Sequence, residues 1–163
     1  MKTLYLVRHA KSSWKHPELD DFERPLNKRG KRDAPRMGQF LMNKGIIPDI
    51  IISSPALRAL MTTKIISDIL SYPKNQVTYF DDIYEADISS LFKILSKVKS
   101  KYNSAMMVGH NPGMTTIANA LTNTRIDNIP TCGVFCTELD ISSWQEISEN
   151  CGELIFFKYP KNL

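Results

Sequence analysis

The stretch LYLVRHAKSSW, residues 4–14, is an apolar run that ends abruptly in an arginine and a histidine. Its apolar part, Leu4 to Val7, is typical of a strand that is buried on both faces of a parallel sheet. Arg8 and His9 then stand at the carboxyl end of that strand, where open α/β sheets bind their ligands. A guanidinium cannot lose its proton, so Arg8 needs an anion in a half-dry cleft. We expect that anion to be a phosphate.

Outward from this strand, helical and strand patterns alternate along the chain. Strands are predicted at residues 49–53, 76–80, 104–108, 133–139 and 153–159, and helices at 27–43, 54–72, 87–98 and 113–121. Such alternation predicts an α/β protein, a three-layer α/β/α sandwich with a mainly parallel central sheet and an antiparallel edge. At 163 residues the chain has the length of a single domain, residues 1–163.

Several local signals set the expected helix boundaries. Asn27 is a plausible N-cap of the first helix, and Pro35 inside it predicts a kink or a start nearer Asp33. Ser54 and Pro55 read as the cap and first residue of the second helix. One row of that helix is apolar at four-residue intervals, at Leu57, Met61, Ile65 and Ile69. Asp87 is the expected cap of the third helix, whose pattern is the most clearly amphipathic.

Composition narrows the class of protein. Apolar residues make up 42% and charged residues 23% of the chain, as in ordinary globular proteins. A net charge of +4 suits an anionic ligand but is too small to indicate nucleic acid. No apolar run is long enough to span a bilayer, so we expect no membrane partner. Three cysteines without metal-type spacing and without a secretory leader are expected to be reduced thiols in the cytoplasm. The oligomeric state stays open.

Three strand-to-helix junctions place unusual residues at one end of the expected sheet. The first carries Arg8 and His9, the second Arg58, and the third His110. Helix N-termini add unpaired N–H groups and positive dipole ends. Together these groups would bind a phosphoryl group and stabilise the charge on its equatorial oxygens during transfer. An imidazole in line can attack phosphorus and hold it covalently until water hydrolyses the intermediate.

The motifs at these junctions resemble those of the histidine phosphatase superfamily, and in particular its short, SixA-like phosphohistidine phosphatases. The motifs are Leu6-Val7-Arg8-His9-Ala10, Ser53-Ser54-Pro55-Ala56-Leu57-Arg58-Ala59 and Val108-Gly109-His110-Asn111-Pro112-Gly113, and Pro25 to Gly30 resembles the family's entry to its first helix. The resemblance implies a phosphoglycerate mutase-like fold. It implies that His9 accepts the phosphoryl group and that Arg8, Arg58 and His110 bind its oxygens. It implies no metal and no cofactor.

Four positions depart from that family pattern or match it weakly. Ala10 replaces the glycine that usually follows the histidine, a strained choice if φ there were positive. Glu85 is the candidate general acid, although a solvated loop carboxylate explains it equally well. Ser12 and Lys15 lie where their side chains could reach the phosphate.

Each feature also has a simpler interpretation. Taken alone, Arg8 and His9 would more often be a surface ion pair. His110 alone could be a helix cap, and Arg58 alone could be a solvated helix residue. The occurrence of all three motifs in the family's order along the chain favours a catalytic site. A basic run lies on the first expected helix, at Lys28, Arg29, Lys31, Arg32 and Arg36. It reads as a solvated face, with docking of an acidic protein partner as the alternative.

The segment between the second and third expected helices bears on the substrate. Only residues 71–87 separate these helices, and a strand uses some of them, so little chain remains for a lid. An open phosphate site suits a phosphohistidine on a phosphotransfer protein, whose labile P–N bond needs little acid catalysis. The alternatives are a phosphatase of small phosphate esters and a phosphate-recognising binding module without turnover.

Overall fold

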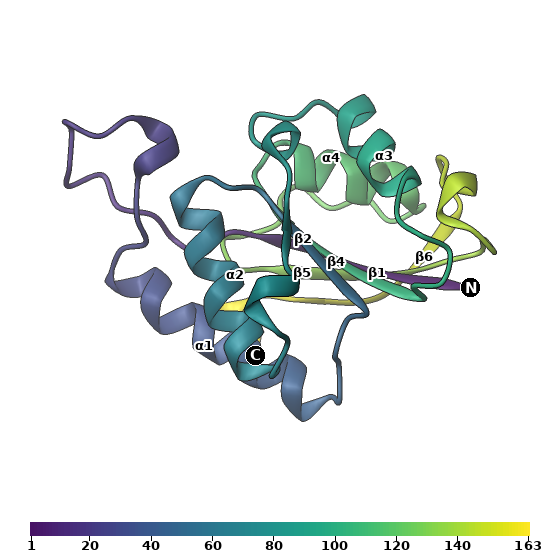
Figure 1. Cartoon of the computed structure of the whole chain (residues 1–163), viewed down its shortest axis with the longest axis horizontal. Helices are drawn as coiled ribbons and strands as arrows, with labels where there is room; N and C mark the ends of the chain where they lie inside the picture. The colour runs from purple at the N-terminus through teal and green to yellow at the C-terminus, as the bar shows by residue number, and fades with distance from the viewer.

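The structure is a computed structural model that describes residues 1–163, and its six strands form one sheet. The strand order is β3-β2-β4-β1-β5-β6, which places β1 near the middle (Figure 1). The strands are β1 (Lys2–Arg8), β2 (Ile50–Ser53), β3 (Thr78–Tyr79), β4 (Ser104–Gly109), β5 (Val134–Leu139) and β6 (Gly152–Lys158). The first four pair in parallel, while β5 and β6 pair antiparallel. The predicted mainly parallel sheet with an antiparallel edge is therefore confirmed.

Four helices cover the two faces of this sheet. They are α1 (Lys28–Asn43), α2 (Leu57–Ile69), α3 (Ile88–Ser96) and α4 (Gly113–Leu121). The pair α1 and α2 lies on one face, and the pair α3 and α4 lies on the other (Figure 1). This arrangement confirms the predicted three-layer α/β/α sandwich. None of these helices combines the length and the apolar character that crossing a bilayer requires.

Strand β1 contributes to both halves of the core. Leu4 and Leu6 are fully buried in the apolar cluster beneath α3 and α4. Tyr5 and Val7 belong to the second cluster, beneath α1 and α2. Successive side chains of a strand point to opposite faces, so an all-apolar run is required where both faces are covered. This double burial fixes the carboxyl end of β1, and with it the position of Arg8.

Helix α1 begins where its cap residue predicts. The Asn27 side chain accepts a hydrogen bond from the Gly30 N–H at 2.9 Å, so the expected N-cap is confirmed. The alternative start near Asp33 is wrong, because the helix runs unbroken from Lys28 through Pro35. A proline inside a helix removes one hydrogen bond and crowds the carbonyl four residues earlier, but here it does not end the helix, whose first turn is fixed by the cap at Asn27.

The predicted start of α2 is wrong, and its apolar row is not its buried face. Helix α2 begins at Leu57, and Ser54 instead accepts from the Ala56 N–H at 3.2 Å in the turn that precedes it. The apolar row of residues 57, 61, 65 and 69 is only half-buried. The buried face is largely polar and consists of Arg58, Ala59, Thr62, Thr63, Ile66 and Ser67. Internal hydrogen bonds make this burial possible, since Thr62 donates to the Arg58 carbonyl at 2.8 Å and Thr63 to Ser53 at 2.9 Å.

The connection from α2 to α3 is short and nearly without regular structure. Strand β3 covers only Thr78–Tyr79, less than the predicted 76–80, because Lys74–Gln76 forms a 3₁₀ turn. A second 3₁₀ turn, Asp81–Ile83, occupies the acidic segment. Asp87 then caps α3 as predicted by accepting from the Ser90 N–H at 2.8 Å. No helix is inserted here that would form a lid over the carboxyl edge of the sheet.

Candidate active site

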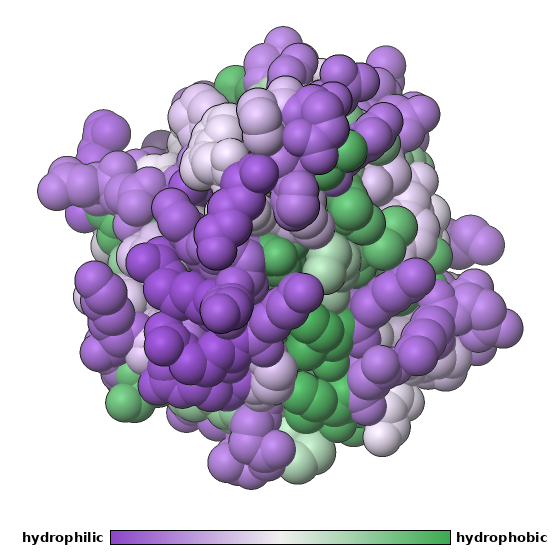
Figure 2. Space-filling model, turned by 90° about the vertical axis from the view of Figure 1, so that its left-hand side faces the viewer, coloured by the Kyte–Doolittle hydropathy of each residue, from purple (hydrophilic) through white to green (hydrophobic).

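The candidate site lies at the carboxyl ends of three neighbouring parallel strands. Arg8 ends β1 and His9 follows it, Arg58 lies in the first turn of the helix after β2, and His110 follows β4. Figure 2 views the molecule from this side, where most of the surface is hydrophilic. The structure brings the two imidazoles together, with ring centroids 5.1 Å apart. Residues about a hundred positions apart in the chain thus meet, as the sequence predicts.

The His9 ring is held in one orientation by the backbone. Its Nδ1 lies 2.8 Å from the Ala10 carbonyl oxygen, which can only accept, so the proton of the neutral ring sits on Nδ1. Nε2 is then left with a free lone pair. Burial lowers the pKa of His9 to about 4, and the nearby Arg58 and Arg8 charges add to this effect. His9 is therefore a neutral imidazole with one unoccupied, nucleophilic nitrogen at neutral pH.

His110 faces His9 from the end of β4. Its Nε2 lies 2.8 Å from the Ser54 hydroxyl, and its Nδ1 is buried without a hydrogen-bond partner. Burial, with smaller contributions from the neighbouring His9 and Arg58, lowers the pKa of His110 to about 3. The two rings are tilted by 50° relative to each other and are not stacked. Ser54, predicted as a helix cap, instead orients this imidazole.

The two arginines are both anchored, yet each keeps an unsatisfied donor. Arg8 donates from Nη1 to the Ile129 carbonyl at 3.0 Å, and burial lowers its pKa. Arg58 donates to the Asp21 carbonyl at 2.6 Å and from Nη2 to the Asp21 carboxylate at 2.9 Å. The Nε of each guanidinium is buried without a partner. Buried N–H groups rarely stay unpaired, so each of these side chains favours an additional acceptor such as an anion.

Three site residues were missed from the sequence: Asp21, Arg24 and Tyr84. The Asp21 carboxylate bonds Arg58, accepts from the Tyr84 hydroxyl at 2.6 Å and from Arg24 Nε at 3.1 Å. The Tyr84 hydrogen bond, followed by that of Arg58, lowers the pKa of Asp21 to about 2. Tyr84 also packs edge-on against His110, with centroids 5.4 Å apart. Loop residues without periodicity carry no sequence signal for such contacts; only the position of Arg24 beside the Pro25 motif hinted at a role.

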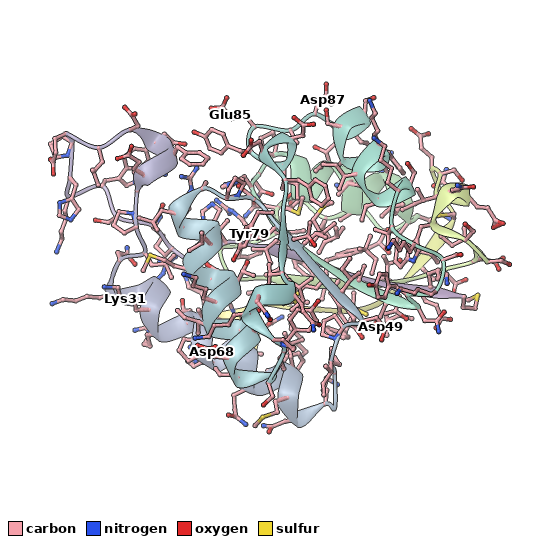
Figure 3. The ribbon with its side chains drawn as sticks, in the orientation of Figure 1. Lys31, Asp49, Asp68, Tyr79, Glu85 and Asp87 are labelled. Atoms are coloured by element: carbon pink, nitrogen blue, oxygen red, sulfur yellow. The ribbon has the colours of Figure 1, made fainter.

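The three remaining predicted site residues lie around this centre in different settings. Ser12 is buried, and its hydroxyl accepts from Arg24 Nη1 at 2.9 Å, which makes it a support of Arg24. The Lys15 side chain is exposed on the loop that follows. Glu85 is also exposed, makes no side-chain hydrogen bond and has φ of 54°; it lies near Asp87 at the outer edge of the molecule (Figure 3). The roles of Ser12, Lys15 and Glu85 stay predictions.

The assembled groups can perform phosphoryl transfer chemistry. They offer one free imidazole nitrogen, two guanidiniums with unpaired donors and a second imidazole, all in a partly dry setting. Fixed cationic donors of this kind stabilise the charge on transferring phosphoryl oxygens. No group of three or more His, Cys, Asp or Glu side chains is arranged to hold a metal ion.

Comparison with known families agrees with this geometry. The sequence profile of the histidine phosphatase superfamily (branch 1) matches residues 4–106, which include the first two motifs, while His110 follows just beyond. The chain therefore belongs to the histidine phosphatase superfamily, and its chemistry is that of a phosphatase.

Individual relatives and solved structures show which proteins the chain resembles in sequence and in fold. The chain is 31% identical over 153 residues to an uncharacterised chloroplastic protein of Arabidopsis thaliana, covering 89% of this chain and 70% of that protein. It is 26% identical to an uncharacterised protein of Mycobacterium leprae, over 95% and 100% of the two chains. A protein assigned as the phosphohistidine phosphatase SixA of Agrobacterium tumefaciens superposes with TM-score 0.83 and 27% identity over 98% of both chains. A SixA protein histidine phosphatase complexed with tungstate has TM-score 0.85 and 18% identity, also over 98% of both chains, and so shows the same fold.

Proposed function

We propose that this phosphatase removes phosphoryl groups from phosphohistidine in a phosphotransfer protein, through a covalent intermediate on His9. The observation that carries the proposal is the state of the His9 ring. Its Nδ1–H is bound to the Ala10 carbonyl, its Nε2 is free, and its pKa of about 4 keeps it neutral. A neutral, fixed and partly dry imidazole is a competent nucleophile toward phosphorus.

The reaction would proceed in two displacements at phosphorus. The His9 Nε2 lone pair attacks phosphorus, the P–N bond of the substrate breaks, and the departing imidazole nitrogen takes up a proton from solvent. Water then attacks the phosphoryl group on His9 and the P–Nε2 bond breaks. Its electron pair returns to Nε2, which leaves the ring neutral with its proton on Nδ1, and orthophosphate leaves with the protons of the water or passes one to solvent. Arg8 and Arg58 would bind the equatorial oxygens throughout, with their unpaired Nε groups as candidate donors.

His110 completes the proposed site. When the Ser54 hydroxyl donates to Nε2, the proton of the His110 ring lies on Nδ1, the nitrogen that has no partner. That N–H would supply another donor to a phosphoryl oxygen. The two arginines already provide cationic charge here, which supports a mechanism without a metal ion.

The open edge of the sheet supports a protein substrate. Residues 70–87 between α2 and α3 hold two 3₁₀ turns and the short β3, and no inserted helix covers the site. A phosphorylated side chain can therefore reach His9 while its own protein stays outside. All three cysteines are free thiols, as expected for the cytoplasmic location that we also propose.

The test is brief exposure of the purified protein to phosphoramidate and to a phosphohistidine domain, each radiolabelled, followed by mapping of the alkali-stable label. We expect label on His9 and release of orthophosphate from both substrates, also in the presence of EDTA. His9→Ala should abolish both, whereas His16→Ala, which changes an exposed histidine, should change neither.

Three results would contradict the proposal. Binding of phosphate without any label on His9 would show a recognition module. Faster turnover of small phosphate esters than of the phosphohistidine domain, with a marked loss in Glu85→Gln, would show a phosphomonoesterase that uses Glu85 as general acid. Loss of activity in EDTA would show that the mechanism requires a metal ion.

A further inference from the structure

A cavity opens on the same side of the molecule as the candidate active site. Its volume is about 550 Å³, and Arg8 is the residue that it shares with that site. Its walls come from the loop after β1, the exposed side of α1, the loop before β5 and the C-terminal residues Tyr159 to Lys161. Figure 2 shows the most strongly hydrophilic side chains gathered on one half of this face. The cavity is called the arginine pocket below.

The arginine pocket carries an unusual concentration of charge. Six cationic side chains and one carboxylate line it, a formal net charge of +5, while the whole 163-residue chain carries +4. The cations are Arg8, Lys11, Arg29, Arg32, Arg36 and Lys161. The rest of the molecule is therefore close to neutral, and the positive potential is focused at this cavity.

Asp33 organises these cations from the floor of the pocket. Its side chain is only 5% exposed and lies 3.8 Å from Arg29, 3.3 Å from Arg32 and 3.4 Å from Arg36. One carboxylate cannot neutralise three guanidiniums. Their side chains stay 46%, 65% and 47% exposed, with donors free to bind other groups. The arrangement is thus a set of pre-positioned guanidiniums in need of additional anions.

We propose that the arginine pocket docks acidic side chains of the phosphorylated protein, next to the phosphohistidine that enters the active site. This inference rests on the proposed function and names what else that substrate must carry. Arg8 belongs to both sites, so a group in the pocket and a phosphoryl group at His9 belong to one bound partner. Arg29, Arg32 and Arg36, the members of the basic run of α1 that line the pocket, then belong to a docking surface, which is the alternative that the sequence left open. Lys28 and Lys31 lie outside it.

The spread of the cations favours carboxylates on a protein surface over a small polyanion. Arg29 and Arg36 are seven residues apart on α1, roughly 10 Å along the helix, and Lys161 approaches from a separate segment. Half-exposed guanidiniums on an open face provide no enclosing wall for a compact ligand. Several carboxylates on a docked surface can meet such a row one by one, and they also steer the encounter.

The pocket is tested by reversing two of its charges without removing the support of Asp33. Arg32 is the most exposed of the three arginines, and Lys161 forms no ion pair. The double variant Arg32→Glu/Lys161→Glu therefore keeps the ion pairs of Asp33 with Arg29 and Arg36. The matched control is Lys31→Glu/Lys64→Glu, which makes the same charge change at exposed positions outside the pocket. Lys31 lies on the same helix, at its N-terminal end (Figure 3). Circular dichroism and melting temperature check that each variant is folded.

The substrates are phosphoramidate and a phosphotransfer domain whose phosphohistidine is flanked by carboxylates. We expect the pocket variant to lower kcat/KM on the domain at least tenfold, through KM, and to keep phosphoramidate turnover within twofold. The control should change neither. Neutralising the flanking carboxylates of the domain should reduce wild-type kcat/KM and remove the difference between the proteins. An unchanged kcat/KM on the domain, or an equal loss on phosphoramidate, would overturn the proposal.

A binding measurement separates this inference from the proposed function. If wild type hydrolyses phosphoramidate but not the phosphohistidine domain, the proposed substrate is wrong. The pocket is then judged by a fluorescent hexaglutamate peptide, which should bind wild type and the control but not the pocket variant. Absence of peptide binding to wild type overturns the pocket proposal. Binding of tripolyphosphate a hundredfold tighter than the peptide, lost in the pocket variant, would identify a small polyanion instead.

Discussion

Asp21 is the residue that most directly opposes an incoming phosphate. Its carboxylate accepts a hydrogen bond from Arg58 Nη2 at 2.9 Å, and hydrogen bonds from Tyr84 and Arg24 keep the carboxylate in this position. A phosphoryl group at Arg58 therefore meets a negative charge already in place, so removing that charge should favour anion binding. We predict that Asp21→Asn tightens inhibition by orthophosphate several-fold, corresponding to about 1 kcal/mol, measured as Ki against phosphoramidate turnover.

Asp20→Asn is the matched control for this prediction. Asp20 is the adjacent exposed carboxylate and forms no ion pair with an arginine, so its neutralisation should leave Ki unchanged. Weaker orthophosphate inhibition in Asp21→Asn alone would show the opposite role for Asp21. It would then act by orienting Arg58, and its charge would be secondary.

The two buried imidazoles make stability depend on pH. Burial holds the pKa of His9 at about 4 and that of His110 at about 3, below the ordinary 6.5. Between about pH 4 and 6.5 the unfolded chain binds these protons and the folded chain does not, so the free energy of unfolding falls as pH falls. Two such groups give a slope of at most about 2.7 kcal/mol per pH unit. Asp21, with its pKa near 2, acts in the same direction but only below its ordinary value of 3.8.

Urea unfolding at pH 7, 6 and 5 measures this dependence. We expect the urea concentration at the midpoint of unfolding to fall on acidification. In His110→Gln, the slope of the free energy of unfolding against pH should be about halved. His16→Gln is the control, since that ring is half-exposed and does not belong to the buried pair. A free energy of unfolding that stays constant from pH 7 to 5 would show that the two rings can be protonated in the folded protein.

At the scale of elements, the entry of α1 depends on a glycine. A Cβ on Gly30 would lie 2.2 Å from the Lys11 carbonyl oxygen, a backbone atom that cannot move aside alone. The same carbonyl accepts from the Asn27 N–H at 3.0 Å, which ties the helix start to the loop after His9. We predict that Gly30→Ala destabilises the fold by about 3 kcal/mol and lowers turnover, measured by thermal unfolding and phosphoramidate hydrolysis.

Gly45→Ala provides the comparison at the other end of α1. Gly45 has φ of 71°, but a Cβ added there would meet no atom within 4 Å, so only the backbone preference is lost, about 1 kcal/mol. Its turnover should match that of wild type, because Gly45 lies far along the helix from the site. Equal losses in the two variants would show that the close approach at Lys11 relaxes easily.

The elements differ in how far the sequence predicts them. Helices with one apolar face and a capping side chain, α1 and α3, begin where Asn27 and Asp87 indicate. The buried face of helix α2 is harder to predict from the sequence, because the helix buries Thr62 and Ser67 and leaves Ile65 only half-buried. Apolar periodicity cannot identify a buried face that is largely polar, and a contact such as the hydrogen bond that Thr62 accepts from the Ala10 N–H at 2.9 Å leaves no pattern in the helix sequence.

The same distinction applies to the candidate site. His9 and His110 could be placed because each ends an apolar strand, and parallel strands align their carboxyl ends. Asp21, Arg24 and Tyr84 could not, because they lie on irregular segments whose path depends on contacts between them. Asp21 and Tyr84 are 63 residues apart and meet at a 2.6 Å hydrogen bond that no pattern in either segment indicates.

At the scale of the whole molecule, charge and shape are arranged around one edge of the sheet. The carboxyl ends of β1 and β4 supply the two imidazoles and Arg8, the helix after β2 supplies Arg58, and α1 adds the arginine pocket beside them. A net charge of +5 at that pocket exceeds the +4 of the entire chain, so an acidic partner is drawn to this side. Docking and chemistry thus share one face, which the absence of an inserted helix leaves open.

This charge distribution predicts a strong dependence on ionic strength for protein substrates. The Debye length shrinks from about 20 Å near 0.02 M salt to about 4 Å near 0.5 M, which screens attraction between half-exposed groups. We expect kcat/KM on an acidic phosphohistidine domain to fall about tenfold across this range, mainly through the association rate. Phosphoramidate, which we expect to bind only between Arg8, Arg58 and the two imidazoles, should lose much less. Stopped-flow turnover of both substrates in NaCl, repeated in Arg32→Glu/Lys161→Glu, measures the difference. A salt dependence equal for the two substrates, or unchanged in that variant, would place the electrostatic attraction at the phosphate site alone.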